Sequence, residues 1–258
     1  MHDRITLFGV TMDNVTAAEA VEAVGRLMKD WNTHGTGQHY VTTPNTDHVV
    51  RLQSDKALRE AHAGAALCIA DGMPVIWASR LLGRPLKERV TGADLLPNVC
   101  AMAAKDGRSL YLLGGLEGVA ERAAHNLRAR FPGLRIAGTY SPPFGFERDA
   151  EECRRIAERI DRARPDILAI GLGCPKQELW IAKHRRDMQY GVALCIGAAI
   201  DFAAGNLSRA PQWMQDNGLE WLFRLAQEPG RLWKRYLVDD MAFARVVARE
   251  WFNRRRSA

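Results

Sequence analysis

The chain has 258 residues and a formal net charge of +6. Because 47% of its residues are hydrophobic, it is long enough to bury one sizeable core or one core with an appendage. No stretch approaches the ~20 uninterrupted apolar residues of a membrane-spanning helix, and the first residues lack the charged start and apolar run of a signal peptide, so we expect a cytosolic protein. The five cysteines are odd in number and none form a C-x-x-C pair, which argues against a disulfide scaffold and a zinc ribbon.

Short apolar runs alternate with longer helical patterns along residues 1–206. The runs that we predict to be strands are 5–10, 39–43, 66–70, 109–113, 134–138, 166–171 and 192–197. The clearest helical patterns between them are 15–31, 94–105, 117–131 and 149–164. Strands and helices that alternate at this spacing predict a Rossmann-like α/β fold, with a mostly parallel sheet flanked by helices.

Residues that could carry chemistry follow two of the predicted strands, and ligands of open α/β sheets bind beyond the carboxyl ends of the strands. Thr43 and Asn45 follow the strand at 39–43, where they could hydrogen-bond a ligand. The alternative is that Thr43 caps a helix whose first residue is Pro44. Asp71 follows the strand at 66–70, and partial burial would raise its pKa into the range of a general base. The alternative for Asp71 is again a helix N-cap.

Three further segments at strand ends or loops suggest a site for phosphate or sugar. Gly114 and Gly115 open a helix and could receive a nucleotide diphosphate, although a plain tight turn explains them equally well. A glycine-rich strand end at 171–177 could bind phosphate or sugar, and its Cys174 has no identifiable histidine partner that would make it a nucleophile. Four basic residues lie close together in the sequence: Arg80, Arg84, Lys87 and Arg89. One or more of them could face the crevice at the strand ends as a counter-charge, and the alternative is a basic loop exposed to solvent.

The chain changes in character after Gly205. Residues 210–227 and 231–251 have helical patterns, and residues 207–258 contain nine arginines and one lysine against six acidic residues, with four of the seven tryptophans. We therefore divide the chain into an α/β core over 1–206 and a basic, Trp- and Arg-rich helical appendage over 207–258. Aromatic and arginine side chains suit the lipid headgroup region, which predicts contact with an anionic membrane surface. Helices that pack on the core with solvated charges are the alternative.

Taken together, these segments form a series of motifs in a fixed order. They are TPN at 43–45, ADGMP at 70–74, RVTG at 89–92, LGG at 113–115, GLGCPKQELW at 171–180, GAAIDFAAG at 197–205, RAP at 209–211 and GLEWLFRLAQEPGRLWKRY at 218–236. The series resembles the WecG/TagA/CpsF family of bacterial glycosyltransferases over nearly the whole chain. That resemblance implies inverting transfer of N-acetylmannosamine or another hexose from a UDP-sugar to a sugar carried on undecaprenyl diphosphate, in the synthesis of surface polysaccharide or teichoic acid.

The resemblance also implies a role for individual residues. Asp71 would be the base that takes the proton of the acceptor hydroxyl, and Arg89 would hold the charge that develops on phosphate. The remaining candidates would bind substrate. They are Thr43, Asn45 and Gln177 for the sugar, Gly114 and Gly115 for UDP, Asp201 for the nucleoside, and Arg224, Arg231 and Arg235 for the diphosphate.

The sequence contains no Asp-x-Asp motif that would hold a metal on the diphosphate, so we expect a transferase that needs neither a metal nor another cofactor. Its partners would be a UDP-sugar, the lipid-linked acceptor and the cytoplasmic face of the membrane. An NAD-type oxidoreductase is the alternative enzyme, although the glycine fingerprint is incomplete. A nucleic-acid-binding protein is suggested by the pI of about 9.2, but the core has no basic stripe, and we expect no nucleic acid.

Overall fold

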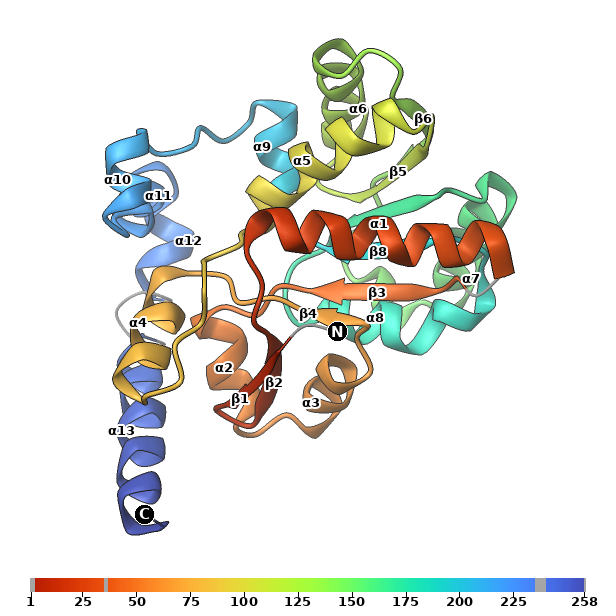
Figure 1. The fold of residues 1–258 in the computed structure, drawn as a ribbon. Helices are drawn as coiled ribbons and strands as arrows, with labels where there is room; N and C mark the ends of the chain where they lie inside the picture. Colours follow the sequence, from red (N-terminus) through yellow and green to blue (C-terminus); the bar gives the residue numbers. More distant parts are fainter. Residues whose placement is uncertain (1–2, 35–36, 235–239, 258) are drawn as a thin grey trace.

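A six-stranded parallel sheet forms the centre of the computed structural model, which describes residues 3–34, 37–234 and 240–257 (Figure 1). The strand order is β4-β3-β8-β7-β5-β6. The strands are β3 (His39–Thr42), β4 (Leu67–Cys68), β5 (Ser109–Gly114), β6 (Arg135–Tyr140), β7 (Ile167–Gly171) and β8 (Val192–Cys195). All neighbouring pairs are parallel, so their carboxyl ends share one edge. This confirms the predicted α/β class with a parallel sheet.

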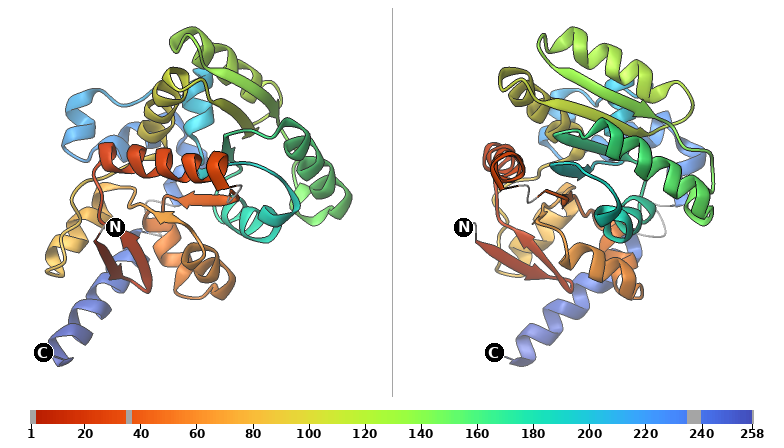
Figure 2. Two further views of the ribbon diagram at one scale, coloured as in Figure 1. Left: turned by 45° about the vertical axis from the view of Figure 1, so that its right-hand side comes forward. Right: turned by 90° about the vertical axis from the view of Figure 1, so that its right-hand side faces the viewer.

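Helices cover both faces of the sheet (Figure 2). On one face, α1 (Ala17–His34), α5 (Gly92–Lys105), α6 (Val119–Arg130) and α9 (Ala199–Ala204) share an apolar cluster with alternate strand residues. On the other face, α7 (Ala150–Ala163) and α8 (Lys176–His184) pack on the intervening strand residues. The central strands β7 and β8 are apolar and buried on both faces, as parallel strands under two helical layers require.

The predicted single strand at 5–10 is wrong. The chain instead makes an antiparallel hairpin of β1 (Arg4–Leu7) and β2 (Val10–Asp13), apart from the central sheet. The two turn residues, Phe8 and Gly9, have φ values of 56° and 78°. Positive φ at both central residues suits the twist of a tight hairpin, and glycine adopts it readily whereas Phe8 does not. The hairpin packs against α2 (Thr46–Leu52), α3 (Lys56–Ala63) and α4 (Met73–Leu81).

The C-terminal appendage is helical, as predicted, and runs along one side of the molecule (Figure 1). It contains α10 (Gln212–Asp216), α11 (Glu220–Gln227), α12 (Pro229–Lys234) and α13 (Asp240–Ser257). The predicted helical segment 210–227 is broken at Gly218, whose φ is 71° and whose backbone packs against Trp77. Phe243 of α13 is buried against Phe8, with ring centroids 5.6 Å apart. The appendage is thus anchored on the N-terminal hairpin.

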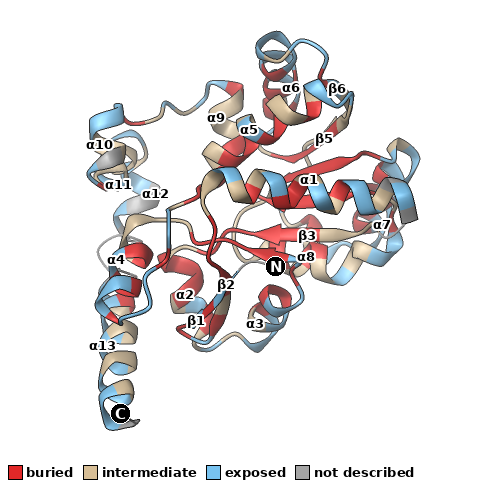
Figure 3. Ribbon diagram, viewed as in Figure 1, coloured by how far each residue is buried: buried red, intermediate tan, exposed pale blue. Residues whose placement is uncertain are grey.

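The outer surface of the appendage remains open to solvent (Figure 3). Trp213, Trp233 and Phe252 are each more than half exposed. The last turns of α13 extend beyond the rest of the molecule (Figure 2). Among residues 3–34, 37–234 and 240–257, no helix combines the length and the apolar composition needed to cross a membrane.

Candidate active site

A cavity of about 390 Å³ opens at the carboxyl ends of the strands, beneath α11. Its walls come from the segments that follow β3, β4, β7 and β8, from the loop before α5, and from the appendage. The structure brings six of the predicted site residues to this cavity: Thr43, Asn45, Asp71, Arg89, Gln177 and Arg224. A second hollow lies between the N-terminal hairpin and α13, away from these strand ends.

Asp71 lies on the cavity wall, three residues beyond the end of β4 and directly after the buried Ala70. Its backbone N–H donates to the carbonyl oxygen of Pro44 at 2.9 Å, which joins the segments that follow β3 and β4. The alternative role as a helix cap is wrong, because Gly72 occupies the N-cap of α4 without a side-chain hydrogen bond. The Asp71 carboxyl group is therefore free of a structural role in α4.

The electrostatic setting of Asp71 suits a base. Burial raises the pKa of Asp71 to about 6, against the opposing effect of the Arg89 and Arg224 guanidinium groups. Glu220 raises the pKa further, whereas His48 lowers it. A carboxylate with a pKa near 6 is largely ionised at neutral pH and yet basic enough to accept a proton from a hydroxyl group in a transition state.

Arg89 and Arg209 both contact one carboxylate of the appendage. A terminal nitrogen of Arg89 donates to Glu220 Oε2 at 2.8 Å, and Arg209 Nε lies 2.8 Å from Glu220 Oε1. Arg209 also pairs with Asp94 of α5 at 2.8 Å. These ion pairs hold the start of α11 against the core, next to the cavity.

Arg224 is the other predicted arginine on the cavity wall. Its guanidinium group lies 5.6 Å from the centroid of the Phe202 ring and 3.9 Å from Glu228. Of Arg231 in α12 the structure describes only the backbone, and Arg235 lies outside the described residues. Arg89 and Arg224 are therefore the two predicted arginines whose charge the structure places at the cavity.

The segment after β3 differs from the expected helix start. Asn45, rather than Thr43, caps α2: its Oδ1 accepts from the backbone N–H groups of Asp47 and His48. Pro44 precedes this cap and is not the first helical residue. Thr43 Oγ1 donates to the carbonyl oxygen of Cys195 at 3.0 Å, which ties β3 to β8. Both side chains still line the cavity.

Gln177 connects two walls of the cavity. Its Oε1 accepts from the backbone N–H of Gly197 at 3.1 Å, and its Nε2 donates to Glu178 Oε1 at 2.7 Å. The side chain is almost fully buried, so these bonds fix its position. Gln177 thereby holds the segment after β8 next to the start of α8.

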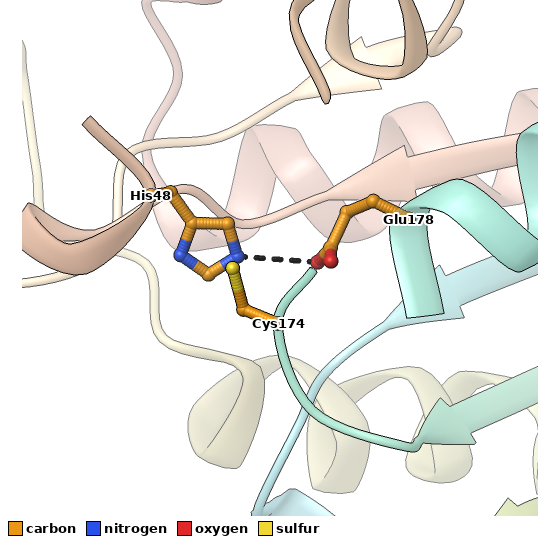
Figure 4. Close-up of side chains that lie close together, drawn as sticks. All are labelled: His48, Cys174 and Glu178. Carbon is orange, nitrogen blue, oxygen red and sulfur yellow. Dashed lines mark hydrogen bonds and ion pairs between the residues drawn. The ribbon is translucent and has the colours of Figure 1, made fainter. Parts of the chain in front are cut away.

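Cys174 has a histidine neighbour that the sequence did not reveal. His48, Cys174 and Glu178 lie together at the cavity, with His48 Nε2 3.2 Å from Glu178 Oε1 (Figure 4). Burial lowers the pKa of His48, but the adjacent Cys174 and Glu178 outweigh it and raise the pKa to about 10. Burial raises the pKa of the Cys174 thiol, and the adjacent His48 opposes this rise.

Gly114, Gly115 and Asp201 do not line this cavity. Gly114 pairs with Gly171 across β5 and β7, and a Cβ atom on Gly114 would lie 2.4 Å from the Gly171 carbonyl oxygen. Close approach of the two strand ends therefore requires glycine at position 114. Asp201 lies on α9, next to the cavity residue Phe202.

Comparison with known proteins shows the family to which the chain belongs. Residues 5–257 match the model of the "Glycosyl transferase WecG/TagA/CpsF family". The chain belongs to this family. It is a glycosyltransferase, as the motifs indicated, and the oxidoreductase and nucleic-acid alternatives give way to that assignment.

Two relatives carry the same name, "N-acetylglucosaminyldiphosphoundecaprenol N-acetyl-beta-D-mannosaminyltransferase". The relative from Bacillus spizizenii is 30% identical over 82% of this chain and 79% of its own length. A relative from Staphylococcus aureus is 28% identical over 90% of this chain and 86% of its own length. The family match over residues 5–257 spans the segments that line the cavity and nearly all of the appendage.

Proposed function

We propose that this glycosyltransferase moves an N-acetylmannosaminyl residue, or a similar hexose, from a UDP-sugar to a sugar linked to undecaprenyl diphosphate, with inversion at the anomeric carbon. The observation that carries the proposal is Asp71, a carboxyl group with a raised pKa that shares its cavity with Arg89 and Arg224. The names of the two relatives support the transferred sugar and the lipid-linked acceptor.

In the proposed reaction, Asp71 acts as the general base. Its carboxylate takes the proton of the acceptor hydroxyl as the hydroxyl oxygen forms a bond to the anomeric carbon. The bond between that carbon and the UDP oxygen breaks on the opposite face of the sugar, and UDP leaves with the bonding electrons. A positioned base contributes roughly 10²–10⁴-fold to such a step.

Arg89 and Arg224 would stabilise the negative charge that grows on the departing diphosphate. Guanidinium groups offer planar, forked donors that match phosphate oxygens, and their charge is permanent. Fixed positive groups aimed at a developing charge can replace a metal ion in this role. We therefore propose a transfer that requires neither a divalent metal nor another cofactor.

The appendage would bring this cavity to its lipid substrate. Glu220, Trp221 and Arg224 of α11 form part of the cavity wall, while Trp213 and Trp233 are exposed on the neighbouring helices. Tryptophan and arginine side chains suit the headgroup region of a bilayer. We infer peripheral attachment to the cytoplasmic face of the membrane, where α11 closes the site and the neighbouring helices α10 and α12 contact lipid.

The direct test incubates the protein with single UDP-sugars and a short-chain lipid-diphosphate N-acetylglucosamine acceptor, followed by mass spectrometry of the products. We expect the mass of one N-acetylhexosamine to be added from UDP-N-acetylmannosamine, and the anomeric configuration to be inverted by NMR. Transfer to water alone, or no transfer from any UDP-sugar, would contradict the proposal.

A further inference from the structure

Three side chains bring a nitrogen, a sulfur and a carboxylate group together beside the cavity, and two of them, His48 and Cys174, line it (Figure 4). His48 comes from α2, Cys174 from the loop between β7 and α8, and Glu178 from α8. Their possible ligand atoms all lie within 4.8 Å of one another. Residues distant in the sequence thus form one compact group of metal-ligating type.

The distances within this group suit a tetrahedral ion. Zinc binds nitrogen, oxygen and sulfur at about 2.0–2.3 Å, so two ligand atoms on one tetrahedral ion lie about 3.3–3.7 Å apart. The distance from His48 Nε2 to Glu178 Oε1 is 3.2 Å. The remaining distances do not exceed 4.8 Å, so side-chain movements of about 1 Å would complete the set.

Glu178 supplies a second, independent observation. Its side chain is fully buried, and its Oε1 accepts from both His48 and Gln177. Its other oxygen, Oε2, is buried without a hydrogen-bond partner in the part of the chain that the structure describes. A buried carboxylate oxygen without a partner is unfavourable, and a bound cation is one group that would satisfy it.

The chemistry of the three ligands selects the kind of ion. Mg²⁺ and Ca²⁺ prefer oxygen ligands alone, whereas imidazole and thiolate favour zinc and similar transition metals. His48 and Cys174 line the cavity, which gives an ion a route to the site. Three protein ligands leave the fourth position of a tetrahedral ion for water or a substrate oxygen. We propose that His48, Cys174 and Glu178 bind one divalent ion of the Zn²⁺ class.

An ion at this position would inhibit transfer, a consequence that rests on the proposed function. Glu178 holds Gln177, and Gln177 in turn holds the backbone of Gly197 on the opposite wall. A metal that draws the Glu178 carboxylate toward His48 and Cys174 competes with the bond to Gln177. It also occupies the wall at which the sugar is proposed to bind. The site is therefore inhibitory and distinct from the charge stabilisation by Arg89 and Arg224.

Cobalt provides a direct measure of binding that does not depend on transfer. Co²⁺ is added to the full-length protein in a thiol-free buffer, and the absorption spectrum is recorded. We expect a thiolate-to-cobalt charge-transfer band and tetrahedral visible bands that saturate at one equivalent and disappear when Zn²⁺ is added. No charge-transfer band would overturn the proposal.

Variants of the proposed ligands test whether the cobalt charge-transfer band comes from this site. Loss of a group that only hydrogen-bonds a metal ligand weakens metal binding about 10–100-fold, so loss of a ligand itself in Cys174→Ser or Glu178→Gln should weaken it about 100-fold or more. Cys153→Ser removes a buried thiol of α7 and should leave the band unchanged. Circular dichroism verifies that each variant is folded. A band that persists in Cys174→Ser would overturn the assignment.

The inhibitory role is tested separately. Zn²⁺ should reduce transfer by the wild type, and EDTA should restore it, whereas Cys174→Ser should retain most of its own activity at the same Zn²⁺ concentration. Equal inhibition of the two proteins would refute this role. If no transfer is detected at all, the proposed function fails while the cobalt spectrum still decides the metal site.

Discussion

A terminal nitrogen of Arg89 lies 2.8 Å from Glu220 Oε2, and both side chains are less than one fifth exposed. Arg89 belongs to the loop before α5, and Glu220 begins α11 of the appendage. This ion pair joins the core to the appendage at the cavity and neutralises the arginine that is proposed to meet the diphosphate. A bound diphosphate must therefore compete with Glu220 for Arg89, which couples substrate binding to the position of α11.

Glu220→Gln tests whether the carboxylate of this ion pair acts on the base. Because the Glu220 charge raises the pKa of Asp71, its removal should lower that pKa and extend transfer activity to more acidic pH. The measurement is kcat/KM between pH 4.5 and 8. Glu250→Gln removes an acidic residue of α13 and serves as the control, with no change in the profile expected. An unshifted acid limb in Glu220→Gln would show that the ion pair does not act on the base.

Several of the residues at the cavity were predictable from the sequence because the order of strands and helices was predictable. Apolar runs that alternate with helical patterns place parallel strand ends at one edge, and Asp71 and Gln177 follow such ends. The core helices α1, α5, α6 and α7 lie within three residues of their predicted bounds. Local patterns therefore sufficed for these four helices, for the strands of the central sheet and for the polar residues that follow those strands.

Long-range contacts were not predictable in this way. His48 looks like an ordinary residue of a short helix, and only the packing of α2 against α8 brings it to Glu178. The pairing of Glu220 with both Arg89 and Arg209 likewise depends on how the appendage folds back. Phe8 at a positive φ gave no sequence signal for the hairpin turn. These features arise from tertiary structure rather than from local propensity.

Asp71→Asn should reduce kcat by roughly 10²–10⁴-fold, because the amide keeps the shape of the carboxylate but cannot accept the proton. Binding of the UDP-sugar, measured by calorimetry, should change little. In the wild type, activity should fall as the pH drops through about 6, the pKa of Asp71, and this limb should be absent from any residual activity of the variant. Asp106→Asn, at the exposed end of α5, is the matched control. Near-normal turnover of Asp71→Asn would exclude Asp71 as the base.

The same substitution should stabilise the fold above neutral pH. The pKa of Asp71 rises from 3.8 to about 6 on folding, so the folded state disfavours the charged form. The wild type therefore loses stability as the pH rises from about 4 through 6, while Asn carries no such penalty. A shift of this size corresponds to about 1–3 kcal/mol after allowance for partial solvent access. Urea denaturation at pH 4.5 and pH 8 measures it; a variant that gains nothing at pH 8 would contradict the raised pKa.

The appendage has an exposed face and a face that packs on the core, and substitutions on the two faces should have different effects. Trp213→Ala, at an exposed position, should weaken binding to anionic liposomes with little effect on stability. Phe243→Ala, buried against Phe8, should instead destabilise the protein by about 3–5 kcal/mol. Phe144→Ala removes a fully exposed aromatic residue that lies outside the appendage, and it is the control for liposome binding. Equal liposome binding by Trp213→Ala and wild type would place the membrane contact elsewhere.

Removal of metal ions should not abolish transfer. Arg89 and Arg224 are proposed to balance the charge on the leaving diphosphate, and a chelator does not alter a guanidinium group. The proposed ion at His48, Cys174 and Glu178 inhibits, so activity in EDTA should equal or exceed that of the untreated protein. The measurement is the initial rate after dialysis against EDTA, then with Mg²⁺, Mn²⁺ or Zn²⁺ restored singly. Loss of transfer in EDTA with recovery in Mg²⁺ or Mn²⁺ would show that a metal, rather than the two arginines, carries the diphosphate charge.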